Sequence, residues 1–265
     1  MNQYPVTPPE SQPVAPPPPV RVSVPASVPY VTYSIVGVTI VFYLLQVASV
    51  YFLGYANAAS QIDWLEFYGA RINVFIRAGE LWRLLTPALL HASILHIGFN
   101  MYALVVFGAG LERNFGHRRF LTLYVLGAFT GNVLSFLLSS GYSIGASTAI
   151  FGLIGAEGVF LYQNRKIFGK QFGRAIGNIL FIVAINFFYD LTPGSGIDLG
   201  GHIGGLLGGL IFTWFAGPLF EVEGIYPALR LADTREAREI LTGVAAVILI
   251  FGALAVIGIF HPINP

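Results

Sequence analysis

The chain has 265 residues, of which 55% are hydrophobic and only 10% are charged, and its mean hydropathy is +0.71. Soluble domains carry about 25% charged residues, so this composition excludes an ordinary water-soluble domain and indicates a membrane protein. Cysteine is absent, which excludes disulfides and thiolate metal sites. The formal net charge is +1 and no basic cluster stands out, so we expect no nucleic-acid partner.

The first 29 residues hold ten of the sixteen prolines, including the run from Pro16 to Pro19. Such a segment has little apolar surface to bury, which is typical of a disordered tail. It also lacks the charged start and apolar middle of a signal peptide, and it shows no transit-peptide pattern. We therefore expect a disordered proline-rich tail over 1–29 and, since no targeting segment is visible, a protein of the bacterial plasma membrane.

Seven apolar runs follow, each near the roughly 17–25 residues that cross a bilayer as a helix. They cover 32–53, 92–111, 118–139, 147–163, 175–192, 200–219 and 240–260. The first six form a main body over 30–220, and a polar cytoplasmic linker with possible helical character follows over 221–239. Residues 240–265 hold the seventh helix and a short tail. The expected fold is an all-α, polytopic membrane helix bundle with a six-span core.

The segment 55–91 differs from the spans because acidic and arginine residues alternate there with tryptophan, phenylalanine and leucine. It is too polar to span the bilayer and too apolar to form a free loop. This mixture predicts a structured element at the membrane interface.

The basic residues predict the orientation of the spans. With the N-terminus in the cytoplasm, eleven of the fourteen lie in the tail or in cytoplasmic loops. The other three, Arg71, Arg77 and Arg83, lie in the interfacial segment. The positive-inside rule therefore favours a cytoplasmic N-terminus, and the second, fourth and sixth spans then run inward from the external face.

Ser147 and His202 lie in the first turns of the fourth and sixth spans, at similar depth near the external face. A histidine in hydrocarbon is costly and by default indicates function. The pair suggests a nucleophile and its general base. His96 and Asn100 share one face of the second span at a similar depth. Their N–H groups and the backbone N–H of Ser147 could stabilise an oxyanion.

Two further residues would support this chemistry. Gly145 would let the backbone approach a substrate closely. Phe151, one turn after Ser147, could hold the His202 ring by stacking. No third carboxylate is evident, so the interpretation is a Ser–His dyad oriented by packing.

Packing alone could also explain parts of this pattern. Ser147 could be a small residue at a helix contact, and the glycines after His202 form a small-xxx-small stripe whose purpose is close packing. His96 and Asn100 could be interhelical hydrogen-bonding groups. The four polar residues taken together favour catalysis, because the glycine stripe would bring the spans close enough for a dyad.

Several short patterns occur together in a fixed order: Trp82-Arg83, His91, the H-x-x-x-N at His96 and Asn100, Glu112-Arg113, Gly145-Ala146-Ser147, and the H-x-x-G-x-x-x-G from His202. Over about residues 33–219 this pattern resembles the rhomboid intramembrane serine proteases.

The resemblance implies that Ser147 is the nucleophile and His202 its base, with His96, Asn100 and the Ser147 N–H as the oxyanion hole. It implies structural roles for Trp82 and Arg83 and a supporting role for His91. No metal or cofactor is implied. The expected partners are the lipid bilayer and single-span or polytopic membrane-protein substrates, cut near the external face. Thr148 departs from the glycine usual at its position, and we expect its β-branched side chain to narrow the substrate cleft or to alter specificity.

Other protein classes fit less well. A zinc protease would need H-E-x-x-H, whereas His91 and His96 are five residues apart with no glutamate between them. An aspartyl protease would need aspartates on neighbouring spans, whereas Asp190 and Asp198 flank one short loop and are expected as loop or cap residues. No internal repeat indicates a transporter. A non-catalytic rhomboid-like binder of membrane segments remains the alternative function.

Overall fold

The computed structural model describes residues 22–23, 28–192, 196–226 and 228–261, so the predicted tail over 1–29 lies almost entirely outside the described residues. The described part forms ten α-helices, two 3-10 helices and three short strands. In chain order these are β1 (Val22–Ser23), α1 (Tyr30–Leu53), α2 (Trp64–Gly69), α3 (Asn73–Arg77), η1 (Leu81–Leu84), η2 (Thr86–Leu89), α4 (Ile94–Phe115), α5 (His117–Leu138), α6 (Ser147–Gln163), α7 (Arg165–Phe168), α8 (Gln171–Asp190), α9 (Leu199–Ala216), β2 (Phe220–Glu223), β3 (Leu229–Asp233) and α10 (Ala237–Phe260).

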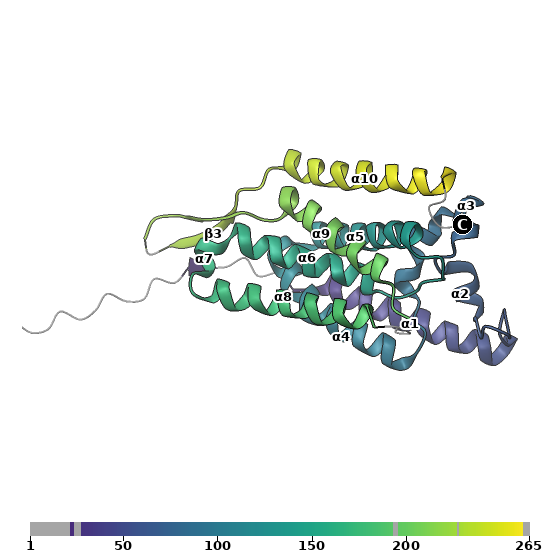
Figure 1. Cartoon of the computed structure of the whole chain (residues 1–265). Helices are drawn as coiled ribbons and strands as arrows, with labels where there is room; N and C mark the ends of the chain where they lie inside the picture. The colour runs from purple at the N-terminus through teal and green to yellow at the C-terminus, as the bar shows by residue number, and fades with distance from the viewer. Residues whose placement is uncertain (1–21, 24–27, 193–195, 227, 262–265) are drawn as a thin grey trace, which may run out of the picture.

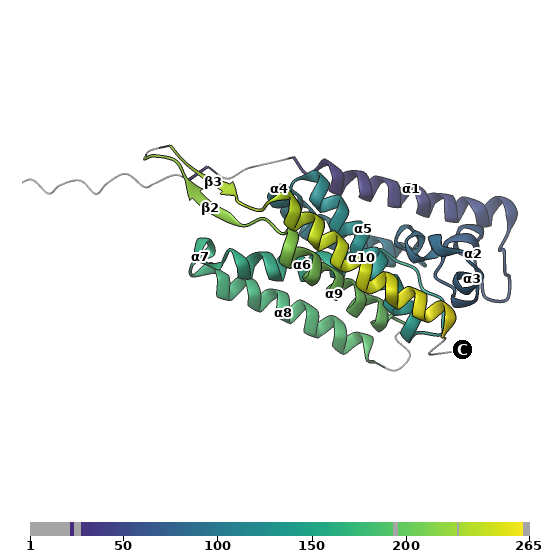
Figure 2. The ribbon, with the colours of Figure 1, turned by 90° about the horizontal axis from the view of Figure 1, so that it is seen from above.

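The long helices run side by side, with α10 and α8 on opposite sides of α6 and α9 (Figure 1) and α1 along another edge (Figure 2). Within the described residues, six helices are long and apolar enough to cross a membrane: α1, α4, α5, α8, α9 and α10. The remaining predicted span, over 147–163, is α6, whose 17 residues lie at the lower limit for a bilayer. The prediction of a polytopic helical membrane bundle is confirmed.

The fully buried side chains of helix α1 are polar. Its buried residues are Thr32, Thr39, Gln46 and Ser49, and the first three recur every seven residues on one face. Valine, isoleucine and leucine side chains of the same helix are exposed. This arrangement suits a lipid solvent, because polar groups gain hydrogen bonds only against the protein.

Helices α5, α6 and α9 form the tightly packed centre, where glycines allow close backbone contact. A Cβ on Gly205 of α9 would lie 1.9 Å from the Thr148 carbonyl oxygen, and one on Gly209 would lie 1.9 Å from that of Gly152. Because no larger side chain fits, the glycine stripe of α9 holds it directly against α6. The predicted packing role of these glycines therefore matches the structure.

Buried arginines hold the interfacial segment together, and one of them ties it to the bundle. Arg83, 1% exposed, donates to the carbonyls of Phe67 and Ala70, each at 2.8 Å. Trp82 Nε1 donates to the Tyr68 carbonyl at 3.0 Å. Arg71 lies 3.8 Å from the Asp198 carboxylate at the start of α9. These bonds give Trp82 and Arg83 structural surroundings.

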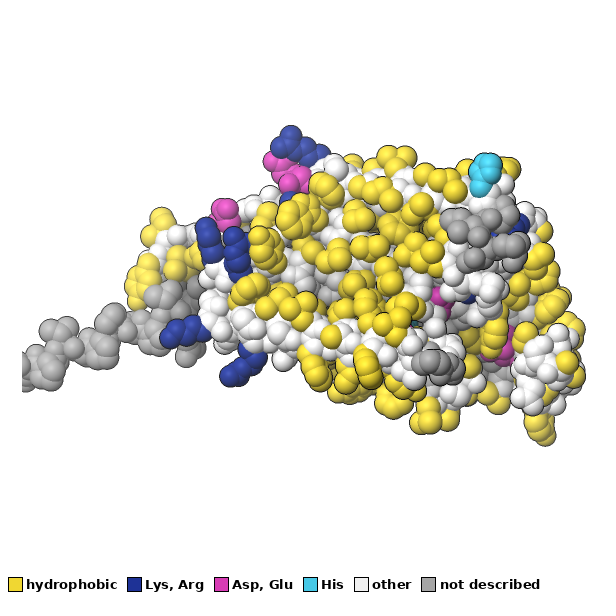
Figure 3. All heavy atoms as spheres, viewed as in Figure 1, with side chains coloured by type: hydrophobic (Ala, Val, Ile, Leu, Met, Phe, Trp, Pro, Cys, Tyr) yellow, Lys and Arg dark blue, Asp and Glu magenta, His cyan; other side chains and the backbone are white. Residues whose placement is uncertain are grey.

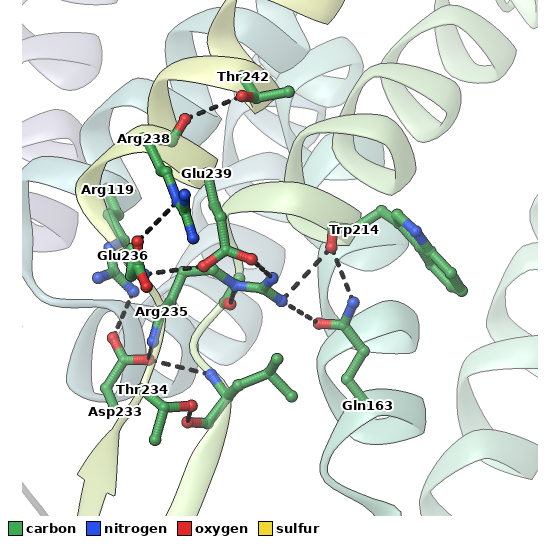
Figure 4. A network of polar contacts seen from close by, with 12 residues as sticks. Arg119, Gln163, Trp214, Asp233, Thr234, Arg235, Glu236, Arg238, Glu239 and Thr242 are labelled. Atoms are coloured by element: carbon green, nitrogen blue, oxygen red, sulfur yellow. Dashed lines mark hydrogen bonds and ion pairs between the residues drawn. The ribbon is translucent and has the colours of Figure 1, made fainter.

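The polar segment after α9 contains strands and not the helix that its sequence allowed. β2 pairs antiparallel with β3, which also pairs parallel with β1. Apolar and polar residues alternate over the four residues of β2, a strand period that the linker interpretation overlooked. Arg235 then joins this hairpin to the bundle by contacts with Glu239, Gln163 and the Trp214 carbonyl (Figure 4). Helix α10 begins two residues later.

The surface fits a membrane protein. Figure 3 shows hydrophobic side chains over the middle of the visible face, with most of the visible Lys and Arg side chains at the end near the hairpin. Exposed large hydrophobic residues are numerous on α1, α4, α8 and α10. A water-soluble monomer rarely exposes such contiguous apolar area, so the chain is an integral membrane protein.

Candidate active site

Ser147 is the first residue of α6 and lies two residues after a glycine in a conformation that L side chains rarely adopt. Gly145 has φ +130°, and a Cβ there would lie 2.9 Å from Nε2 of His96. The Gly145 N–H donates to the Pro87 carbonyl at 2.9 Å, which holds the turn in place. Glycine is therefore required at this position to let the turn before the serine pass against His96.

His202 lies in the first turn of α9, and its ring stacks on Phe151 of α6. The two ring centroids are 4.1 Å apart with an interplanar angle of 15°. Phe187 of α8 in turn stacks on Phe151, with the two ring centroids 5.7 Å apart. The imidazole plane is thus held by an aromatic stack that joins three helices.

His96 and Asn100 lie near the start of α4, whose N-cap is Ser93. The Ser93 hydroxyl accepts from the His96 N–H at 3.2 Å. Asn100 Nδ2 donates to the His96 carbonyl at 2.9 Å. An amide nitrogen carries two hydrogens, so Asn100 keeps one for another acceptor.

One cavity of about 790 Å³ brings the predicted residues together. Ser147, His202, His96 and Asn100 all line it, as does Phe151, and its walls come from α4, α6, α8, α9 and the loop before α6. Within the described residues Ser147 and His202 are not hydrogen-bonded to each other. Catalytic hydrogen bonds often tighten only with substrate bound, so the lack of a hydrogen bond between the two side chains is compatible with a dyad.

His91 lies behind the serine turn and does not line the cavity. Its Nε2 accepts from the Ala146 N–H at 3.4 Å, and its own N–H donates to Gln46 of α1 at 3.0 Å. Burial, followed by the nearby His96, lowers the pKa of His91 to about 3. The His91 imidazole thus contacts the residue before Ser147, and Gln46 is a partner that the sequence interpretation missed.

Asp190 is the functional candidate that sequence reasoning missed. It is the last residue of α8, and its Oδ2 lies 2.7 Å from Nδ1 of His202. Its side chain is 1% exposed and that of His202 is 8% exposed. The expectation of a plain loop or cap residue is wrong. The signal was present: consecutive antiparallel helices bring the end of α8 beside the start of α9.

Asp198, the other aspartate of this loop, does act as a cap. It accepts from the Gly201 N–H at 3.0 Å and from the Ser139 hydroxyl at 3.0 Å, and it also contacts Ser135. Burial alone would raise the pKa of Asp198, but hydrogen bonds from Ser135 and the charge of Arg71 outweigh it and lower the pKa below its ordinary value.

Thr148 does not narrow the cavity, contrary to the expectation from sequence. It is 3% exposed and is absent from the cavity wall. Its side chain packs against Gly131 of α5, where a Cβ would come within 2.5 Å, and against Gly201 of α9. The threonine is accommodated because two facing residues lack side chains, so its volume lies between helices.

Metal ligation finds no support in the site. Across the described residues, no group of three or more His, Asp and Glu side chains could hold a metal ion. The chemistry available in the cavity is that of a hydroxyl, imidazoles, an amide and a carboxylate.

Comparison with known proteins relates the chain to one family. The family model described as "Rhomboid domain" matches residues 78–219. The chain is 41% identical over 171 residues to "Rhomboid protease GluP" of Bacillus subtilis (strain 168), covering 64% of this chain and 33% of that protein. It is 36% identical over 185 residues to "RHOMBOID-like protein 6, mitochondrial" of Arabidopsis thaliana, covering 67% and 59%.

A third relative is "Rhomboid-like protease 3" of Toxoplasma gondii, 36% identical over 137 residues, with 51% of this chain and 52% of that protein covered. The chain thus matches between one third and three fifths of the length of these three relatives. The matched residues include every position that lines the cavity from α4, α6 and α9.

Proposed function

The chain belongs to the rhomboid family, and on this premise we propose that it is an intramembrane serine endopeptidase that cleaves membrane-protein segments. The observation that carries the proposal is the single cavity lined by Ser147, His202, His96 and Asn100. Two of the relatives above with protease in their names, GluP and Rhomboid-like protease 3, are consistent with it.

In the proposed reaction, His202 accepts the hydroxyl proton of Ser147 while the serine oxygen bonds to the scissile carbonyl carbon. The oxyanion that forms accepts from the Ser147 N–H at the start of α6, from His96 and from the free N–H of Asn100. His202 then gives its proton to the leaving amine as the C–N bond breaks. Water hydrolyses the acyl-enzyme by the same steps and regenerates the serine.

The substrate is proposed to be a single-span or polytopic membrane protein in the bilayer. The carbonyls of an intact helix are bonded and sterically covered, so a substrate helix must unwind locally before Ser147 can attack. Rhomboid resemblance favours a small residue before the cleaved bond. The basic residues favour a cytoplasmic N-terminus, which would put the cavity near the external face, and the bacterial plasma membrane remains the proposed location.

Cleavage of a single-span reporter protein by the full chain in liposomes tests the proposal. Ser147→Ala and His202→Ala are each expected to abolish cleavage, because one removes the nucleophile and the other its base. Ser140→Ala and His261→Ala, which change exposed residues outside the cavity, are expected to cleave like the wild type. Continued cleavage by Ser147→Ala would exclude the serine mechanism, and a folded wild type that binds but never cuts would favour the non-catalytic binder.

A further inference from the structure

The buried carboxylate of Asp190 contacts the proposed base, His202, at its Nδ1 atom. Asp190 Oδ2 lies 2.7 Å from His202 Nδ1, within hydrogen-bond distance. Both side chains are nearly excluded from solvent, at 1% and 8% exposed. A carboxylate–imidazole contact of this length in a buried site is a short, charge-assisted hydrogen bond. Such a bond is stronger than an ion pair on an exposed surface.

We propose that Asp190 is a positioning residue for His202, so that this chain uses a Ser147–His202–Asp190 triad. The inference rests on the proposed function and deepens it. An ionised carboxylate can only accept, so Asp190 requires the proton of His202 to be on Nδ1. The Nε2 atom is then left with its lone pair for the Ser147 hydroxyl, the tautomer that a serine nucleophile needs.

Stacking on Phe151 alone cannot set the orientation and tautomer of the His202 ring. A face-to-face contact at 4.1 Å and 15° fixes the plane of the His202 ring. It does not distinguish the ring from the same ring turned by 180° about its axis, nor one neutral tautomer from the other. The carboxylate removes both ambiguities, because only Nδ1–H in the observed orientation reaches it.

The second contribution of Asp190 is charge. When His202 takes the serine proton it becomes an imidazolium in a site shielded from water, and an adjacent carboxylate stabilises that cation. The other ionisable side chains that line the cavity with His202 are His96 of α4, Asp198 with its partner Arg71, and Tyr102, Tyr142 and Tyr189. Asp198 is engaged by Gly201 and Ser135, so Asp190 is the carboxylate placed to act on the ring.

The arrangement has a clear origin in the chain. Asp190 ends α8 and His202 lies in the first turn of α9, twelve residues later. The two helices are antiparallel neighbours in sequence, so their joined ends place the two side chains at one level. The aspartate reaches His202 from α8, whereas Ser147 approaches from α6.

Steady-state kinetics of Asp190→Asn in liposomes, measured across pH, tests the inference. We expect kcat to fall at least about tenfold, up to the ~10⁴-fold loss that the equivalent change causes in serine-protease triads, with KM little altered. The acid limb of the kcat/KM profile should move to lower pH, because loss of the anion makes the imidazolium easier to deprotonate. Asp190→Glu should restore part of kcat and the original acid limb.

Asp233→Asn is the matched control. It removes the charge of a hairpin aspartate that pairs with Arg119 of α5 and does not line the cavity. Its acid limb and kcat should match the wild type. If Asp190→Asn does not yield folded protein, the acid limb of Asp190→Glu and its rate of inactivation by a fluorophosphonate provide the same test, with a displaced limb or slowed inactivation expected from the altered contact.

Two results would overturn the inference. One is an Asp190→Asn enzyme with wild-type kcat and acid limb. The other is a loss of activity with an unmoved acid limb and no rescue by glutamate, which would indicate a merely structural carboxylate. A wild type that shows no Ser147-dependent cleavage would instead reject the proposed function itself, so the two failures are distinguishable.

Discussion

Helices α8 and α9 follow one another in the chain and both reach the cavity, yet they are held in the bundle very differently. In the most apolar 18-residue window of each helix, 56% of α9 is buried and 6% of α8. The buried residues of α9 are mostly glycines in backbone contact with α5 and α6, whereas α8 buries only Ile179 and Asp190. The position of α9 in the bundle is therefore determined more closely than that of α8.

The contrast separates two ways of positioning a catalytic group. His202 is placed by a helix that is held against α5 and α6 by close glycine contacts over residues 200–209. Asp190 is placed by the end of a helix that faces the lipid along most of its length, and its carboxylate contacts His202. Packing thus positions the base, and a polar contact sets its orientation and tautomer.

The largest expected effect comes from the same substitution made on each helix. Gly205→Ala on α9 puts a Cβ 1.9 Å from the Thr148 carbonyl, so α9 must move from α6 and stability should fall by at least about 2 kcal/mol. Gly177→Ala on α8 meets nothing within 4 Å and should be neutral or stabilise by about 0.5–1 kcal/mol, because alanine favours a helix. Thermal unfolding in detergent measures both, and equal effects would remove the contrast.

The next effect concerns acid stability at the start of α9. The folded-state pKa of Asp198 lies below its ordinary value, so the carboxylate adds stability above about pH 4 that is lost as pH falls through the lowered pKa. Asp198→Asn keeps the N-cap, since asparagine caps as well as aspartate, but loses the charge. The wild type should therefore be more stable than the variant at pH 7, and the two should converge as the pH falls below the lowered pKa. A gap in unfolding temperature that stays constant with pH would contradict this account.

The smallest expected effects lie in the aromatic stack. Phe151→Leu removes the ring in direct contact with His202 and should lower kcat by up to about tenfold, the equivalent of ~1.4 kcal/mol. Phe187→Leu on α8 acts only through Phe151 and should lower kcat by less than about threefold. Rate constants for the reporter protein at saturating concentration decide between them, and a larger loss for Phe187→Leu would assign α8 a greater positioning role.

Much of the fold could be predicted because a bilayer restricts the choices. Runs of apolar residues predict the long helices, and the H-x-x-x-N of α4 and the glycine stripe after His202 predict which faces meet. Direction of the spans then brings Ser147 and His202 to one level. These inferences need only the standard geometry of an α-helix and the spacing of residues along the chain, and that spacing can be read from a single sequence.

What the sequence did not predict depends on side-chain directions between elements. Thr148 was expected in the cleft, but it lies between α5 and α9 because Gly131 and Gly201 leave room for it. Asp190 was expected as a loop residue, because its contact with His202 arises from how the ends of α8 and α9 meet. The hairpin over β2 and β3 was missed because its short strands carry little hydrophobic signal.

The most direct test of the central claim is to identify the residue that reacts with a fluorophosphonate probe, by mass spectrometry of the full chain in liposomes. We expect one adduct, on the peptide that contains Ser147, which forms slowly in His202→Ala and not at all in Ser147→Ala. An adduct on another residue, or equal labelling of Ser147→Ala and the wild type, would contradict the assignment of Ser147 as the activated nucleophile.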